Sequence, residues 1–258
     1  MVNQCFNVLI LLFRAFTTQS EERRNEHRFL LAAAIAKKLG GFRLYKHSHT
    51  WYRDTDYLNI WKRFPEARST APIKDKQWAI WQLARSVSGL QGDTAECGVY
   101  RGAGSFLILA ATEGQSRMHH VFDSFEGLST PVNVDLPVDP KAHRWQKGEL
   151  GASLELVQKN LSQFSSRVRF HRGWIPTRFS DVGAESFSFV YIDVDLYQPT
   201  LDSLKFFYPR TVKGGLLVCD DYGFIDCPGA RKAVDEFLAD KPERVIHLTS
   251  GQGVVIKR

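Results

Sequence analysis

Two pairs of aspartates in the second half of the chain have the residue types and spacing of a metal site. YIDVDLYQPT places Asp193 and Asp195 after an apolar stretch, and GGLLVCDDYG ends another such stretch in Asp220 and Asp221. If the two strands are neighbours in one sheet, these carboxylates converge and repel one another. Mg²⁺ prefers oxygen ligands and relieves such repulsion. The pattern predicts a magnesium site of Asp193, Asp220 and Asp221, and the structural alternative is ordinary turn aspartates.

The segment ECGVYRGAGS, residues 96–105, has a second set of residues suited to ligand binding. Gly98, Gly102 and Gly104 allow a tight turn and the close approach of a ligand, with a helix N-terminus behind them. Their order does not match the GxGxxG fingerprint of dinucleotide sites. An acid at the start of the turn, Glu96, would repel a pyrophosphate but suits a ligand with an ammonium group.

A further acid, Asp123 in VFDSFEG, follows the next apolar stretch and is placed to accept both hydroxyls of a ribose. A ligand that combines a ribose with a cationic amino-acid tail is S-adenosylmethionine. The alternatives are a plain glycine turn at 96–105 and an aspartate that only caps a turn.

Alternating strand-like and helix-like segments must position these residues. The expected strands are 92–100, 119–125, 167–173, 188–195 and 214–221, with a hairpin-like pair at 244–250 and 253–258. The expected helices are 74–89, 104–114, 153–164, 199–211 and 228–240. This alternation predicts a doubly wound, mostly parallel sheet covered on both faces. Ligands of such sheets bind at the carboxyl ends of the strands, where all these acids lie.

Composition bounds the remaining possibilities. The chain has 258 residues, 43% of them apolar, which suffices for one core of doubly wound size. Its four cysteines form no CxxC pair, which indicates reduced thiols and a cytoplasmic location. Residues 1–63 hold 11 Lys+Arg and 5 Asp+Glu, so they carry the whole net charge of +6. A solvated basic helix face explains this charge, with a site for an acidic partner as the alternative. Without a basic stripe interleaved with aromatics we expect no nucleic-acid partner.

The N-terminal part is expected to be a helical extension. FNVLILLF, residues 6–13, is too short for a transmembrane helix and lacks the flanks of a secretory signal. It could pack on the body or lie on a partner or a membrane surface. A helix over 21–39 is expected to stop at Gly40 and Gly41. We therefore predict a basic-aromatic cap segment, 1–73, with subunit contacts in a homo-oligomer, and a catalytic domain, 74–258.

Residues 75–258 resemble the macrocin O-methyltransferase family of metal-dependent sugar and antibiotic O-methyltransferases. The resemblance lies in the order and spacing of ECGVYRGAGS, FDSFEGL, YIDVDLYQPTLDSL, FYPR, GGLLVCDDYG and PGARKAVDEF. Members often read GVWRGG where this chain has GVYRGAG. The resemblance implies a Rossmann-like class I methyltransferase in which Asp193, Asp220 and Asp221 bind Mg²⁺ and Asp193 acts as general base.

The same resemblance implies the donor contacts. Glu96, Gly98, Asp123 and Ser124 would contact S-adenosylmethionine, and Gly173 and Trp174 would lie near the adenine. Further candidates for substrate or cofactor contacts are Tyr100, Arg101, His143 and His171.

The predicted function is Mg²⁺-dependent transfer of a methyl group from S-adenosylmethionine to a hydroxyl of a small molecule. A sugar hydroxyl is the first choice of acceptor, and a phenolic hydroxyl is the second. Acceptor choice is assigned to residues 1–73 and 128–152. A nicotinamide oxidoreductase is disfavoured by the missing GxGxxG and by Glu96. Three mutually repelling acids disfavour a non-catalytic binding protein, and a metal-dependent phosphoesterase has no use for Glu96 and Asp123.

Overall fold

The computed structural model describes residues 2–38, 50–67 and 74–258, and the chain divides into two compact units, Met1–Asn59 and Ile60–Arg258. The expected helix stop at Gly40 and Gly41 lies outside the described residues. The boundary expected after residue 73 follows a stretch that also lies outside them, so it stays a prediction.

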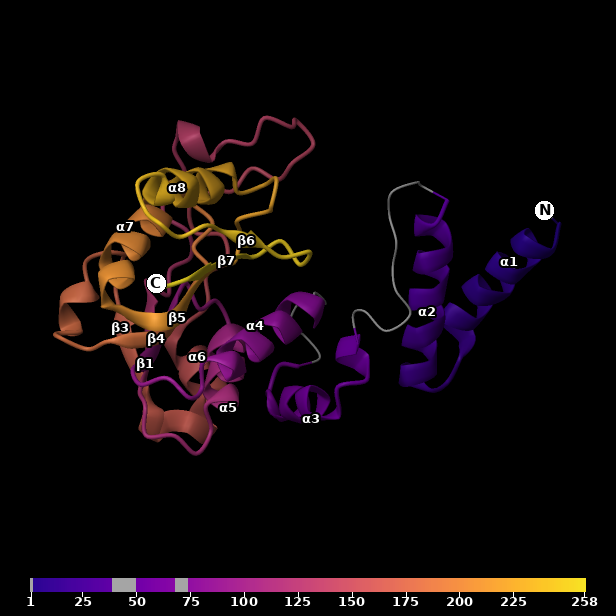
Figure 1. The fold of residues 1–258 in the computed structure, drawn as a ribbon, viewed down its shortest axis with the longest axis horizontal. Helices are drawn as coiled ribbons and strands as arrows, with labels where there is room; N and C mark the ends of the chain where they lie inside the picture. The colour runs from indigo at the N-terminus through magenta and orange to yellow at the C-terminus, as the bar shows by residue number, and fades with distance from the viewer. Residues whose placement is uncertain (1, 39–49, 68–73) are drawn as a thin grey trace. The chain divides into compact units, whose positions relative to one another are not determined.

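The N-terminal unit is built mainly from two helices, α1 (Val2–Thr17) and α2 (Glu21–Ala36) (Figure 1). The Ser20 hydroxyl caps α2 by accepting a hydrogen bond from the backbone N–H of Arg23, and Arg28 Nε donates to the Ala15 carbonyl at 3.1 Å. A 3₁₀ turn, η1 (Thr50–Tyr52), follows, and α3 (Thr55–Arg63) crosses the division between the units. Among the described helices, none combines the length and apolar character that a membrane span requires.

The second unit is built on one seven-stranded sheet with the order β3-β2-β1-β4-β5-β7-β6. Its strands are β1 (Asp93–Cys97), β2 (His119–Asp123), β3 (Val168–Arg172), β4 (Phe187–Ile192), β5 (Thr211–Cys219), β6 (Ile246–His247) and β7 (Gly253–Ile256). The first five run parallel, and β7 is antiparallel to both β5 and β6. The predicted parallel sheet and the closing hairpin-like pair are confirmed.

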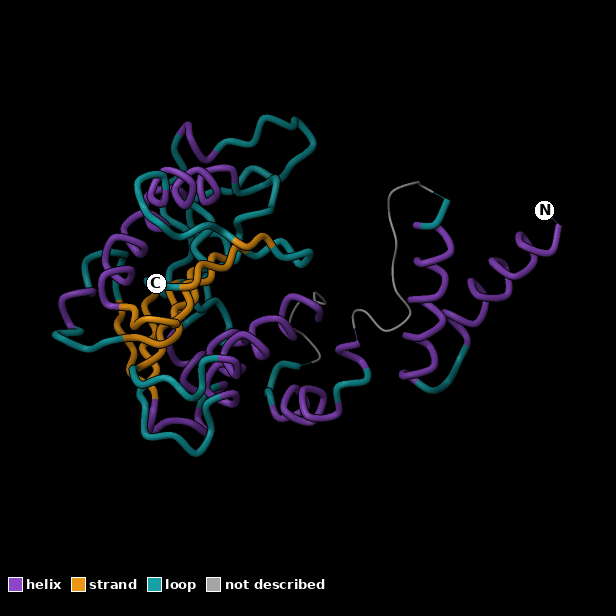
Figure 2. Tube along the Cα trace, in the orientation of Figure 1, coloured by secondary structure: helices purple, strands orange, loops and turns teal. Residues whose placement is uncertain are grey.

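Helices cover both faces of this sheet. Figures 1 and 2 show α4 (Lys74–Ser86), α5 (Ala103–Ala111) and α6 (Leu154–Asn160) on one face, with α7 (Tyr197–Phe207) and α8 (Pro228–Leu238) on the other. The shorter 3₁₀ segments are η2 (Asn133–Asp135), η3 (Ser162–Arg167), η4 (Phe179–Asp181) and η5 (Tyr208–Arg210). Ser153 caps α6 as expected, because its hydroxyl accepts from the backbone N–H of Leu156.

The core lies between the sheet and these helices. Every residue of β4 is buried, and the ring of Phe207 from α7 packs edge-on against Phe187 and Phe122, with centroids 5.0 and 5.7 Å away. Near this cluster the His171 ring lies 4.3 Å from that of Phe122 and hydrogen-bonds His120 and Asp181. The structure therefore gives His171 partners within the fold.

The strand register sets the position of the site. Cys97 at the end of β1 pairs with Phe122 of β2 and with Ile192 of β4, and Ile192 pairs with Cys219 of β5. Because parallel strands end at the same edge, the residues that follow these four lie in one row. These residues are Gly98, Asp123, Asp193 and Asp220.

Candidate active site

The three aspartates predicted to bind a metal come together at the ends of β4 and β5. One carboxylate oxygen each of Asp193, Asp220 and Asp221 lies within 4.8 Å of the other two. Asp220 is 1% exposed and Asp221 is 4% exposed. We call these three residues the acidic triad.

Their environment disfavours negative charge. Burial raises the pKa of Asp193 well above its usual range, and the charges of Asp220 and Asp221 raise it further. Burial also raises the pKa of Asp221, with Asp195 and Asp220 adding to the effect. The acidic triad therefore carries its full charge only beside a cation.

The cation beside the triad in this structure is a residue that the sequence analysis missed. Lys76 of α4 forms an ion pair with Asp220 Oδ2, and its side chain is 16% exposed. Burial opposes the charge of this ammonium, but the three triad carboxylates outweigh burial and raise the pKa of Lys76. A signal was available, because Lys76 lies four residues before buried Ile80 and so continues the core-facing stripe of the helix.

The other oxygen of Asp220 is held by the fold. The Tyr191 hydroxyl donates a hydrogen bond to Asp220 Oδ1, and Gln252 Nε2 donates to the same oxygen at 3.1 Å. Tyr191 comes from β4 and Gln252 from the turn before β7, so a strand and a turn fix the orientation of this carboxylate.

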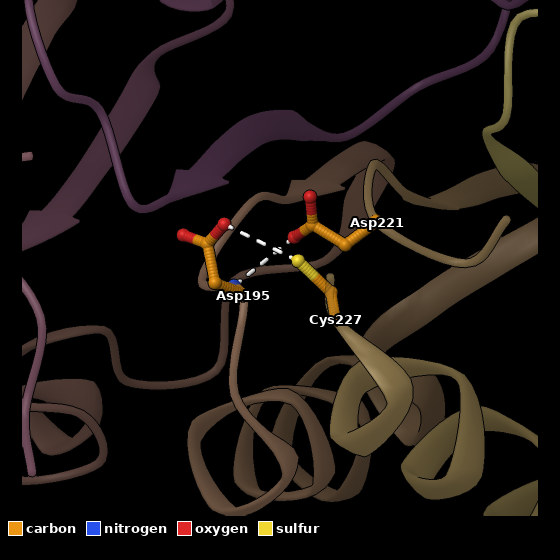
Figure 3. A group of neighbouring side chains, drawn as sticks. All are labelled: Asp195, Asp221 and Cys227. Atoms are coloured by element: carbon orange, nitrogen blue, oxygen red, sulfur yellow. Dashed lines mark hydrogen bonds between the residues drawn. The ribbon is translucent and has the colours of Figure 1, made fainter. Parts of the chain in front are cut away.

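A second cluster adjoins the triad and shares Asp221 with it. Figure 3 shows Asp195, Asp221 and Cys227, which the structure also groups at metal-ligand spacing. The backbone N–H of Asp195 donates to Asp221 Oδ2 at 3.0 Å, and the Cys227 thiol contacts Asp195 Oδ1 at 3.6 Å. Burial, together with the charge of Asp220, raises the pKa of Asp195 to about 6. Asp195 has a φ of +60°, which turns the chain sharply beside the triad.

On the other side of the row, Glu96 of β1 is buried against α5. Ser105 donates a hydrogen bond to Glu96 Oε2, and burial raises the pKa of Glu96 to about 8 although Ser105 lowers it. A Cβ atom at residue 104 would lie 2.1 Å from Glu96 Oε1, so a side chain there would have to displace this carboxylate. Ser105 also hydrogen-bonds His119 Nε2 at 2.8 Å, which was not predicted.

Asp123 at the end of β2 accepts hydrogen bonds from two loops. Its Oδ2 accepts from the N–H of Val99 at 2.7 Å, and its Oδ1 accepts from the N–H of Phe125 at 2.6 Å. Burial raises the pKa of Asp123, and these amides oppose the rise. The neighbouring Ser124 is engaged in its own turn, where its hydroxyl donates to the Gly127 carbonyl. We call Glu96 and Asp123 the donor pair, after the methyl donor that they are predicted to bind.

Gly98 joins the donor pair to the acidic triad. It has a φ of +79°, and a Cβ atom here would lie 1.8 Å from the backbone oxygen of Asp193. The turn continues through Tyr100, which is 40% exposed and has a φ of +45°. Arg101 points its guanidinium at Glu66, with Nη1 3.0 Å from Oε2, so this side chain already has a partner in the protein.

Two further predicted donor contacts follow β3. The N–H of Gly173 donates to the Asp123 carbonyl at 2.9 Å, which brings this loop to the end of β2, and Trp174 is partly buried beside it.

The connection 128–152 is attached to the starts of α7 and α8. Asp135 accepts a hydrogen bond from the N–H of Tyr197, and the indole of Trp145 donates to Cys227 Sγ. His143 lies on this connection and hydrogen-bonds Glu149 at 2.7 Å.

The strand order, with β7 inserted antiparallel between β5 and β6, and the acids at the carboxyl edge define a class I methyltransferase fold. A solved structure described as the O-methyltransferase NovP is similar, with a TM-score of 0.57 and 28% identity. The similarity covers 70% of this chain and 78% of that one.

A sequence profile described as Macrocin-O-methyltransferase (TylF) matches residues 77–248, more than half of the chain. The chain therefore belongs to the macrocin O-methyltransferase family, as the sequence motifs predicted.

Two curated relatives are similar over part of their length. The mycinamicin III 3''-O-methyltransferase of Micromonospora griseorubida is 34% identical over 58% of this chain. The 8-demethyl-8-(2,3-dimethoxy-alpha-L-rhamnosyl)-tetracenomycin-C 4'-O-methyltransferase of Streptomyces olivaceus is 32% identical, also over 58% of this chain. The matches span 61% and 59% of those proteins, respectively.

Proposed function

We propose that this chain transfers a methyl group from S-adenosylmethionine to a hydroxyl of a small molecule and that it needs Mg²⁺ to do so. The observation that carries the proposal is the single row of strand ends in which the donor pair stands beside the acidic triad. A nicotinamide site or a phosphoesterase would not use both groups.

The acidic triad fits a magnesium ion. The three atoms that would hold the ion are carboxylate oxygens, which Mg²⁺ prefers. When bound, Mg²⁺ supplies a positive charge that lowers the pKa of the acceptor hydroxyl. Asp193, Asp220 and Asp221 would hold the ion, and Tyr191 and Gln252 would keep Asp220 oriented toward it.

The donor pair fits the two ends of S-adenosylmethionine. Glu96 would bind the ammonium group, and Asp123 would bind the ribose hydroxyls while keeping its hydrogen bonds to Val99 and Phe125. The N-cap of α5 is Gly102, which has no side chain to cap the helix. The Ser105 N–H in the first turn hydrogen-bonds Glu96, and the N–H groups of Ala103 and Gly104 suit the carboxylate of S-adenosylmethionine. Gly98, Ser124, Gly173 and Trp174 would complete the walls of this pocket.

A carboxylate must take the proton from the acceptor hydroxyl as the methyl group moves. Asp193 was predicted for this role, but as a triad member it is committed to the ion. Asp195 lies in the adjoining cluster, outside the triad, with Oδ1 facing the thiol of Cys227 (Figure 3). We therefore propose Asp195 as a second candidate for the base, and Asp195→Asn should slow methyl transfer without weakening metal binding.

The acceptor that we propose is a sugar hydroxyl of a glycoside. The name of one relative contains a rhamnosyl group, the name of the other contains mycinamicin III, and this chain is similar to both. The connection 128–152 is the proposed acceptor wall, because it reaches the triad side through Trp145 and Cys227. The buried thiols of Cys97, Cys219 and Cys227 support a reducing compartment such as the cytoplasm, and association of copies through residues 1–73 stays a prediction.

The test is a methyl-transfer assay with labelled S-adenosylmethionine and a panel of desmethyl glycosides, with and without EDTA. EDTA and Asp221→Asn should each abolish transfer, and Mg²⁺ should restore only the EDTA-treated enzyme. Asp202→Asn, at an aspartate that hydrogen-bonds Gln198 on α7, is the matched control and should keep activity. Undiminished transfer by the EDTA-treated enzyme would contradict the metal requirement.

A further inference from the structure

A positively charged side chain of the same protein lies against the acidic triad. Lys76 reaches from α4 to Asp220 Oδ2, and its Nζ lies 4.3 Å from the centroid of the Phe224 ring. The charges of Asp193 and Asp221 also act on this ammonium. The Lys76 ammonium therefore supplies, beside the same carboxylates, the positive charge that the proposed metal ion would supply.

The two oxygens of Asp220 have different partners, and this difference decides what metal binding must displace. Oδ1 is held by Tyr191 and Gln252, which are neutral and belong to the sheet and its turn. Oδ2 is held by Lys76, whose charge repels a second cation at short range. The lysine side chain is also the partner that can move, because its four-carbon stem is flexible and it is not fully enclosed.

We propose that Lys76 and the metal ion compete for the acidic triad: the ammonium neutralises part of the triad charge in the metal-free enzyme and leaves Asp220 when the metal binds. This inference rests on the proposed metal site. Lys76 is thus a positioning residue that keeps the carboxylates close together before the metal arrives, and it makes metal affinity weaker than three carboxylates alone would give.

Titration calorimetry with Mg²⁺ and Mn²⁺ tests the competition. Lys76→Met should bind either metal about tenfold more tightly than the wild type or better, because no ammonium has to be displaced. Lys76→Arg keeps the positive charge and should stay close to the wild type. Lys213→Met, at an exposed lysine near the opposite end of β5, removes the same charge away from the triad and is the matched control.

Thermal unfolding gives a second readout. Without metal, Lys76→Met should melt at a lower temperature than the wild type, since the triad then loses the charge of this ammonium, and saturating Mg²⁺ should raise its melting temperature by more. Equal or weaker metal binding by Lys76→Met, with normal binding by the wild type, overturns the competition and leaves the metal site standing. No metal binding by either protein overturns both proposals.

A labelling experiment on the wild type covers the case in which Lys76→Met does not fold. Acetic anhydride should modify Lys76 slowly in the metal-free enzyme, where its ammonium is paired and buried, and several times faster in saturating Mg²⁺. Mass spectrometry of the digested protein measures both rates, with exposed Lys213 as the internal reference. An unchanged or slower rate at Lys76 in Mg²⁺ overturns the proposal.

Discussion

On the donor side of the candidate site, Asp123 receives hydrogen bonds from the backbone amides of Val99 and Phe125, and Glu96 receives one from Ser105. On the metal side, Asp193 and Asp221 lie against other carboxylates, and the counter-charge comes from Lys76 on a separate helix. The comparison shows that the donor pair is held by hydrogen bonds, whereas the acidic triad has hydrogen bonds to Asp220 and Asp221 and also needs a cation to balance its charge. The two halves should therefore respond differently to the same kind of change.

The largest effect that separates the halves is expected for Asp193→Asn. Loss of one of the three oxygen ligands should reduce methyl transfer about a thousandfold, which corresponds to the several kcal/mol that a metal contributes to such a reaction. Calorimetry should show an unchanged affinity for S-adenosylhomocysteine, since the donor pair is intact. A parallel loss of S-adenosylhomocysteine binding would show that the halves are not separable.

In the donor half, the buried carboxyl of Glu96 should make the stability of the protein depend on pH. Glu96 has its folded pKa raised to about 8, so between pH 5 and 7 the folded protein keeps a proton that the unfolded chain releases. Stability therefore falls as the pH rises, by about 3 kcal/mol over this range from Glu96 alone. Urea denaturation of donor-free protein should show this part of the decline in the wild type and not in Glu96→Gln. Equal slopes in the two proteins would refute the assignment to Glu96.

A smaller effect of opposite sign is expected from His119, which reaches Glu96 through Ser105. Burial lowers the pKa of His119 to about 3, so below pH 6.5 the unfolded chain takes up a proton that the folded protein does not. Between pH 6.5 and 5 this should cost about 2 kcal/mol of stability. In the same denaturation experiment, the wild type should lose about 2 kcal/mol of stability more than His119→Asn between pH 6.5 and 5. An equal loss in the variant would refute the assignment of this effect to His119.

The smallest expected effect is that of Ser105→Ala. The variant loses the hydrogen bonds to Glu96 and His119, which should lower the free energy of unfolding by about 1 kcal/mol at pH 7. Ser162→Ala, at an exposed serine, is the control and should change stability by less than about 0.5 kcal/mol. If both variants behave alike, the buried serine does not organise the donor half.

The sheet and most of the site were predictable because their signals are local. Each expected strand overlaps an observed one, and the aspartates directly follow the apolar runs of β4 and β5. Asp123 was predictable for the same reason. Which acid Lys76 would meet was not predictable: the helix stripe directs this lysine toward the core, but Asp220 lies far away in the sequence.

Two other features depended on backbone geometry that the sequence does not display. The backbone N–H of Asp195 reaches Asp221 through a left-handed backbone conformation, which residues with a side chain adopt much less often than glycine. The Glu96 carboxylate that Ser105 binds also lies where a side chain at residue 104 would begin, and the sequence alone does not show this contact between α5 and β1.

The contact of Gly98 with the Asp193 carbonyl has a consequence for how acceptor preference can change. This contact leaves no room for even one added carbon atom, so the backbone itself sets the distance between the proposed sulfonium site and the proposed metal site. Acceptors of different size therefore cannot be accommodated by widening that gap. A change in acceptor preference has to come from the loops that surround the site, while the distance over which the methyl group would move stays the same.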